Sequence, residues 1–125
     1  MNNDYFDRLL KQKICKKSNI PFGETYHITP TLGSGNFERV ILDDDIEIAI
    51  LREANTYSLA ESSFDCKDEF LEVGYVAEGQ CYMELLNEDK HYDIKGHSIF
   101  IYRMHNDIET FNFSFKDCVS ISIKI

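Results

Sequence analysis

Histidine and cysteine are the side chains in this sequence that could bind a transition metal or supply a nucleophile and its base. They are His27, His91, His97, His105, Cys15, Cys66, Cys81 and Cys118. No two histidines are separated by a single residue, and no cysteines form a C-x-x-C pair. Local spacing therefore indicates neither a metal site nor a catalytic pair. We predict no metal, no cofactor and no catalytic residue, with His97 in a turn and the cysteines reduced in the core.

Binding of a small molecule is better supported than catalysis. The chain has seven tyrosines and nine phenylalanines, and aromatic walls with a few polar anchors are typical of ligand sites. Arg52 and Arg103 lie near the ends of apolar stretches, and arginine can hold a carboxylate through two hydrogen bonds. The predicted ligand-binding residues are Arg52, Tyr75, Tyr82, Met83, Tyr102 and Arg103. The alternative is that the aromatic rings fill the core and each arginine pairs with a surface acid.

The charge of the chain restricts its partners. Twenty-two acidic residues against 13 basic ones give a net charge of −9. Because affinity for nucleic acids depends on Lys and Arg neutralising phosphates, we expect no contact of this chain with DNA. There is no apolar run of membrane-spanning length and no signal-peptide core after the polar N-terminus, so we predict a cytoplasmic protein with no membrane contact.

The start of the chain has the pattern of a short amphipathic helix. From Asp4 to Lys17, apolar residues recur at helical spacing with lysines on the other side, and Pro21 follows. We predict a helix lying on the body of the protein. The expected organisation is a helix and linker over 1–20 and one domain over 21–125.

The rest of the chain has the pattern of β-strands. A hairpin is predicted from Asn36–Leu42 and Ile46–Arg52 around an aspartate turn at 43–45. Between Glu69 and Tyr102, short apolar runs broken at Gly79 and Gly96 predict strands joined by tight turns. From 108 to 125 two alternating strands are predicted, the second with Val119, Ile121, Ile123 and Ile125 on one face. These elements predict an all-β fold, an antiparallel β-barrel or jelly roll with a short N-terminal α-helix.

The stretch around Gly79 and Gly96 also resembles a known family. A strand ending in Glu78-Gly79, a hairpin, and Gly96 before an apolar strand resemble the core of a cupin barrel. With the preceding hairpin, Leu32 to Ile125 resembles the effector-sensing N-terminal domain of AraC-family transcriptional regulators, and is most similar to the pyochelin-regulator type.

The resemblance implies a non-catalytic domain that senses a small-molecule effector, an acidic molecule or a metal chelate, and that forms a homodimer. DNA binding would belong to a C-terminal helix-turn-helix half, so we expect this chain to hold the sensing half only. Metal-binding cupins carry an H-x-H pair where this sequence has Gly74-Tyr-Val-Ala-Glu78, which argues against a metalloenzyme. The alternatives are a small cupin enzyme, such as an isomerase or dioxygenase, and a stand-alone ligand-binding barrel.

Overall fold

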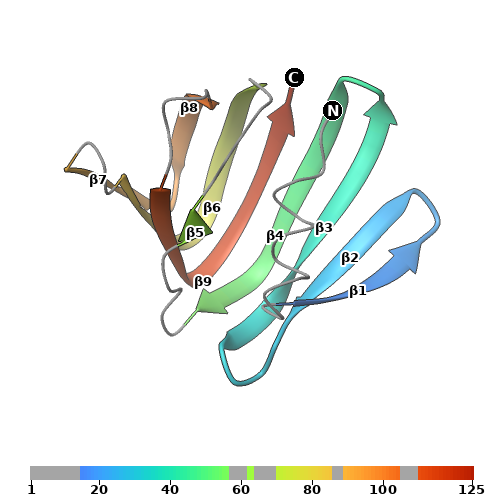
Figure 1. The fold of residues 1–125 in the computed structure, drawn as a ribbon, viewed down its shortest axis with the longest axis horizontal. Helices are drawn as coiled ribbons and strands as arrows, with labels where there is room; N and C mark the ends of the chain where they lie inside the picture. The colour runs from blue at the N-terminus through green and yellow to red at the C-terminus, as the bar shows by residue number, and fades with distance from the viewer. Residues whose placement is uncertain (1–14, 57–61, 64–69, 86–88, 105–109) are drawn as a thin grey trace.

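The computed structural model is built from antiparallel β-strands, which confirms the predicted all-β class (Figure 1). It describes residues 15–56, 62–63, 70–85, 89–104 and 110–125, without the side chains of 62, 63, 70, 85, 104 and 110–113. The strands are β1 (Cys15–Ile20), β2 (Gly23–Ile28), β3 (Gly33–Asp43), β4 (Ile46–Thr56), β5 (Ser62–Ser63), β6 (Phe70–Leu85), β7 (Lys90–Lys95), β8 (Ser98–Met104) and β9 (Thr110–Lys124).

The predicted N-terminal helix is wrong at its C-terminal end. Residues 4–14 lie outside the described part of the chain, but Cys15, Lys16 and Lys17 belong to β1. Here pairing with β2 outweighs the helical pattern, because Cys15 lies opposite Ile28 and is buried. No helix in the described ranges is long and apolar enough to span a membrane.

Two long strands hold the fold together. The sheet runs in the order β1-β2-β3-β4-β9-β6, and β6 then pairs with β8 along 70–76 and with β7 along 80–85. Strand β9 likewise pairs with β4 along its second half and with β5 at its start. Because β6 and β9 pair with each other throughout, they carry the sheet around a corner, and the strands fan out on both sides of them in Figure 1.

The corner is made by irregular residues that lie close together. Gly79 and Asp117 have positive φ values of 74° and 45°, and the β6–β9 register shifts around Glu78. A Cβ on Gly79 would lie 2.2 Å from the carbonyl oxygen of Asp117, so only glycine fits. Asn55 closes the corner by accepting a hydrogen bond from the Asp117 amide at 2.9 Å.

The predicted turn at Gly79 is wrong, because Gly79 lies in a bulge within the continuous strand β6. The two strands predicted between 108 and 125 are likewise one strand, β9, from 110 to 124. The hairpin of β3 and β4 is confirmed, as is the turn at Gly96. In that turn the positive φ, 66°, falls on His97.

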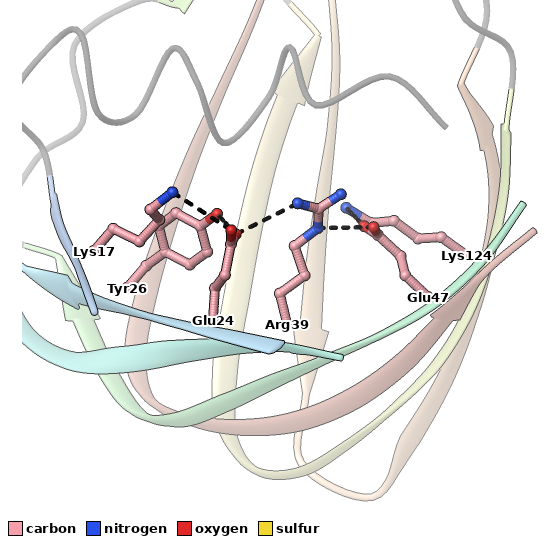
Figure 2. A network of polar contacts seen from close by, with 6 residues as sticks. All are labelled: Lys17, Glu24, Tyr26, Arg39, Glu47 and Lys124. Carbon is pink, nitrogen blue, oxygen red and sulfur yellow. Dashed lines mark hydrogen bonds and ion pairs between the residues drawn. The ribbon is translucent and has the colours of Figure 1, made fainter. Parts of the chain in front are cut away.

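The sheet buries polar side chains on one face and leaves apolar ones open on the other. In β9, Ser120, Ser122 and Lys124 are buried, whereas Ile121 and Ile123 are 49% and 43% exposed. The alternation was predicted correctly, but its apolar face is the more exposed one. We call the buried side the concave face, since its side chains project into the curve of the sheet in Figure 2, and the other side the outer face.

Candidate functional site: a polar cluster on the concave face

Charged and hydroxyl side chains gather on the concave face, and we call this set the concave polar cluster (Figure 2). Its members are the six residues drawn in Figure 2, Lys17, Glu24, Tyr26, Arg39, Glu47 and Lys124, and three that the figure does not draw, Glu72, Tyr102 and Ser122. Strand register brings them together, because residues paired across neighbouring strands point to the same side. Glu24 lies opposite Arg39, and Lys124 lies opposite Glu47 on one side and Glu72 on the other.

The centre of the cluster is the ion pair of Arg39 and Glu47. Arg39 Nε donates to Glu47 Oε2 at 2.7 Å, and both side chains are only 3% exposed. Burial opposes the charge of Arg39, but the hydrogen bond and the attraction of Glu47 outweigh it, so the pKa of Arg39 lies above its usual value. Arg39 therefore stays a fixed cation inside the protein.

Glu24 connects this pair to the more open end of the cluster. Its carboxylate accepts a hydrogen bond from Tyr26, lies 3.4 Å from Lys17 Nζ and lies 3.5 Å from Arg39 Nη1. The hydrogen bond from Tyr26 and the two cations lower the pKa of Glu24, against a smaller effect of burial. Burial and the carboxylate together raise the pKa of Tyr26, so its phenol remains a donor. The Lys17 side chain is 42% exposed, which makes this end the most accessible to solvent.

At the other end, Glu72 holds two hydroxyl groups. Ser122 Oγ donates to Glu72 Oε1 at 2.6 Å, and the Tyr102 hydroxyl donates to Glu72 Oε2. Lys124 lies opposite Glu72 in the strand register, and its Nζ is 3.8 Å from Glu47 Oε1, so it lies between this end and the central pair. Both oxygens of the buried Glu72 carboxylate therefore accept hydrogen bonds, as a buried acid requires.

Small residues leave space above the sheet between these polar side chains. Ala49 lies beside Arg39, and opposite Ser122 on β9. Gly74 lies opposite Ser122 on the other side, and a Cβ there would come within 2.2 Å of the Phe100 ring. The Phe100 ring thus occupies the space that a side chain at residue 74 would need, and it stacks with the Tyr102 ring at a centroid distance of 6.1 Å.

The cluster presents polar groups of the kind that can contact a polar ligand. It offers three carboxylates, three cations and three hydroxyl groups, held by mutual hydrogen bonds and ion pairs. In the described part of the chain no three His, Cys, Asp or Glu side chains are grouped so that they could hold a metal ion. His27, His91 and His97 are exposed and lie on β2, on β7 and in the β7–β8 turn.

The structure does not bring the six predicted ligand-binding residues together. Tyr102 belongs to the concave polar cluster, and Met83 packs against the core. Tyr82 stacks on His91 of β7, with ring centroids 6.1 Å apart. For each of these three residues a ligand-binding role stays a prediction.

The other three predicted residues are on the outer face or exposed. Arg52 donates to Glu38 at 2.9 and 3.3 Å, the surface pairing considered as the alternative to effector binding. The Tyr75 hydroxyl lies 3.2 Å from His97 Nδ1, and Arg103, opposite Leu71 on β6, is exposed. Their roles as effector anchors remain untested.

The buried residues of the cluster were missed because their pattern is ambiguous. Ser120, Ser122 and Lys124 alternate with isoleucines, and such a strand is normally expected to bury its apolar side. The same holds for Glu72 and Gly74 among Leu71, Val73 and Tyr75. The available signal was the small size of Gly74, Ser120 and Ser122, which leaves room above the sheet for long polar side chains.

The described cysteines are thiols of low reactivity, of which Cys15 and Cys118 are buried and Cys81 is half-buried. Burial raises the pKa of Cys15 to about 11, and burial together with nearby acidic groups raises that of Cys81 to about 12. Burial also raises the pKa of Cys118. Because the thiolate is the reactive form, these residues should be inert near neutral pH.

We expect Cys15, Cys81 and Cys118 to react with Ellman's reagent at pH 8 at least about 100-fold more slowly in the folded protein than in urea. Replacing Cys66 by Ser first ensures that the absorbance reports only these three thiols. A stoichiometric fast phase in the folded Cys66→Ser protein would contradict the burial of at least one of them.

Comparisons with known proteins give a fold but no sequence family. No protein-family model matches the sequence, and no curated protein sequence matches it. Among solved structures, protein NMB1881 from Neisseria meningitidis has a TM-score of 0.50 at 9% identity, covering 71% of this chain and 81% of that one. A cupin superfamily protein from Desulfitobacterium hafniense DCB-2 has a TM-score of 0.47 at 12% identity, covering 69% and 71%.

A regulatory protein is also among these neighbours. The AraC-like transcriptional activator CuxR has a TM-score of 0.52 at 13% identity over 74% of this chain. The match covers only 33% of CuxR, so this chain corresponds to about a third of that protein's length. The chain thus shares its all-β fold with a part of an AraC-like activator.

Proposed function

We propose that this chain is the non-catalytic sensing domain of an AraC-type transcriptional regulator in the cytoplasm, and that a small polar effector binds at the concave polar cluster. The observation that carries the proposal is the burial of Arg39 and Glu47, both 3% exposed, on the concave face of a sheet whose outer face is apolar. Buried ion pairs add little net stability compared with apolar packing, so a ligand-binding role accounts better for their presence.

The cluster favours an effector that carries an acidic group, either a free organic acid or a metal chelate. Arg39 and Lys124 are the buried cations, and their contacts to Glu24 Oε2 and Glu47 Oε1 are long, at 3.5 and 3.8 Å. An effector carboxylate would form shorter charge-assisted bonds with both cations. Tyr26 and Tyr102 would supply hydroxyl groups at the two ends of the cluster.

Sensing further requires that the effector bind two arrangements of the regulator with different affinity. Because a net charge of −9 disfavours contact with phosphates, our proposal places DNA binding in another part of the regulator. The coding sequence downstream of Ile125 tests this assignment directly. We expect a pair of helix-turn-helix units there, and a stop codon immediately after Ile125 would contradict the proposal.

Ligand binding is tested by thermal shift with a fixed panel of citrate, salicylate and the ferric complexes of hydroxamate and catecholate chelators. We expect at least one compound to raise the Tm of the wild type and of Arg52→Ala, and to have a much smaller effect on Arg39→Lys. Arg39→Lys retains the charge but loses the planar fork of donors. If no compound acts, or if only Arg52→Ala loses the response, the acidic effector at this cluster is refuted.

A further inference from the structure

The outer face of the sheet carries a continuous apolar surface. Its exposed members, which we call the outer apolar face, are Ile46 of β4, Leu71, Val73 and Tyr75 of β6, Ile99 and Ile101 of β8, and Ile121, Ile123 and Ile125 of β9. Each of these residues is between 36% and 73% exposed. They extend across strands that are neighbours in the sheet, in the order β4-β9-β6-β8.

Strand register makes this surface continuous. Val73 lies opposite Ile101 of β8 on one side and Ile123 of β9 on the other, and Tyr75 is flanked in the same way by Ile99 and Ile121. Directly paired side chains on one face of a sheet lie in contact range. The half-buried Ile48 and Ile50 extend the surface onto β4, opposite Ile123 and Ile121.

The surface is large enough for a stable interface. Aromatic side chains can bury about 150–250 Å² each. For the smaller aliphatic residues we take the lower part of this range, about 150–200 Å² when fully exposed. At their observed exposures the nine residues therefore present roughly 650–900 Å². A standard protein interface buries about 800 Å² per partner, whereas apolar patches on monomers seldom exceed a few hundred Å².

The width and charge of the outer apolar face indicate which kind of partner binds there. Strands are about 4.8 Å apart, so the four strands of the face span about 19 Å, whereas a helix with side chains is about 10–12 Å across and would leave about 7–9 Å of that width open. Its nine members are uncharged although the chain has a net charge of −9, and charged side chains on the same side lie at its edges, among them Arg103 opposite Leu71 and Glu38, which lies opposite Ile50 and pairs with Arg52. Two equally acidic copies could meet here without burying a carboxylate.

We propose that the outer apolar face is the homodimer interface, on which the same face of a second copy packs sheet against sheet. A two-fold axis places one patch against itself, and an uncharged aliphatic face is complementary to itself. Two such sheets pack about 10 Å apart with their strands within about 30° of each other. The inference gives a location to the dimerisation implied by the resemblance and does not depend on effector binding.

Sedimentation equilibrium of the ligand-free chain tests the interface. We expect the wild type to have about twice the 14.6 kDa mass of one chain at about 50 µM, since interfaces of this area bind in the micromolar range or tighter. The double variant Ile99→Lys, Ile101→Lys should raise the dissociation constant about 100-fold or more, because it places charges in the contact. Both positions are more than 65% exposed, so a circular dichroism spectrum like that of the wild type should show that the variant is folded.

The matched control is Phe22→Lys. Phe22 is 81% exposed but lies in the turn between β1 and β2, away from the outer apolar face. This variant should dimerise like the wild type. A monomeric wild type, a double variant that still dimerises, or equal weakening by Phe22→Lys would each overturn the proposal. Failure here leaves the thermal-shift result untouched, because that experiment measures ligand binding at the opposite face.

The competing occupant is the chain's own apolar segment over residues 4–14. A variant lacking residues 1–14 distinguishes the two. If the second copy covers the face, this truncated protein dimerises as the wild type does. If instead the wild type is monomeric and the truncated protein associates, the segment is the occupant and the dimer proposal is wrong.

Discussion

Glu47→Ala should destabilise the protein by about 3–5 kcal/mol, which is the usual cost of removing one partner from a buried ion pair. Glu47 accepts the 2.7 Å hydrogen bond of Arg39 and lies 3.8 Å from Lys124 Nζ, and the side chains of these three residues are each at most 9% exposed. The substitution deprives two buried cations of this carboxylate. Since small domains are stable by about 5–15 kcal/mol, the midpoint of urea unfolding should fall markedly.

Two variants separate charge from other effects in this experiment. Glu47→Gln keeps the shape of the side chain, so it should also destabilise strongly if charge is the cause. Arg52→Ala removes the ion pair to Glu38 on the outer face, where the arginine side chain is 57% exposed, and it should cost no more than about 1 kcal/mol. Equal losses for Glu47→Ala and Arg52→Ala would contradict the burial of the concave polar cluster.

Gly79→Ala should be strongly destabilising as well. Residue 79 has φ of 74°, where a side chain costs about 1–3 kcal/mol in strain. The added Cβ would also lie 2.2 Å from the Asp117 carbonyl oxygen and 2.3 Å from that of Lys116. These are backbone atoms on the other long strand, so relief would require moving β6 away from β9. We expect a loss of about 3 kcal/mol or more in unfolding free energy, or failure to fold.

Gly96→Ala is the matched control. It lies in the β7–β8 turn near the same corner, and its amide donates to the carbonyl of Gly79 at 2.8 Å. A Cβ there would meet its nearest atom at 3.4 Å, so the change should be tolerated within about 1 kcal/mol. If the two alanine variants unfold at the same urea concentration, the tight packing assigned to Gly79 is wrong.

The sequence was sufficient for the fold class because local patterns and tertiary structure agree in most strands. The β3–β4 hairpin is an example, since alternation, the aspartate turn and the apolar run at 46–52 all favour the same answer. The continuity of β6 and β9 was not predictable in the same way. Gly79 can serve a turn or a bulge, and only the close approach of the Asp117 backbone, distant in sequence, decides between them.

The candidate site was less accessible to sequence reasoning. Tyr102 was predicted and lies in the concave polar cluster, but Arg39, Glu47 and Lys124 come from three strands, and nothing in their spacing relates them. A period of two shows which residues share a face without showing which face is covered. Arg52 was chosen because it follows an apolar run, yet the residue that is buried with an acid is Arg39 on the neighbouring strand.

The alternation along β9 has a consequence for how the domain could respond to a molecule bound at the concave polar cluster. Ser122 and Lys124 face the concave polar cluster, while Ile121, Ile123 and Ile125, which alternate with them along the strand, belong to the outer apolar face. Successive residues are only about 3.3 Å apart along a strand. A displacement of this backbone by a bound molecule would therefore shift the isoleucines directly, and signal transfer would need no chain of intermediate side chains. Communication between the two surfaces would cross the thickness of a single strand.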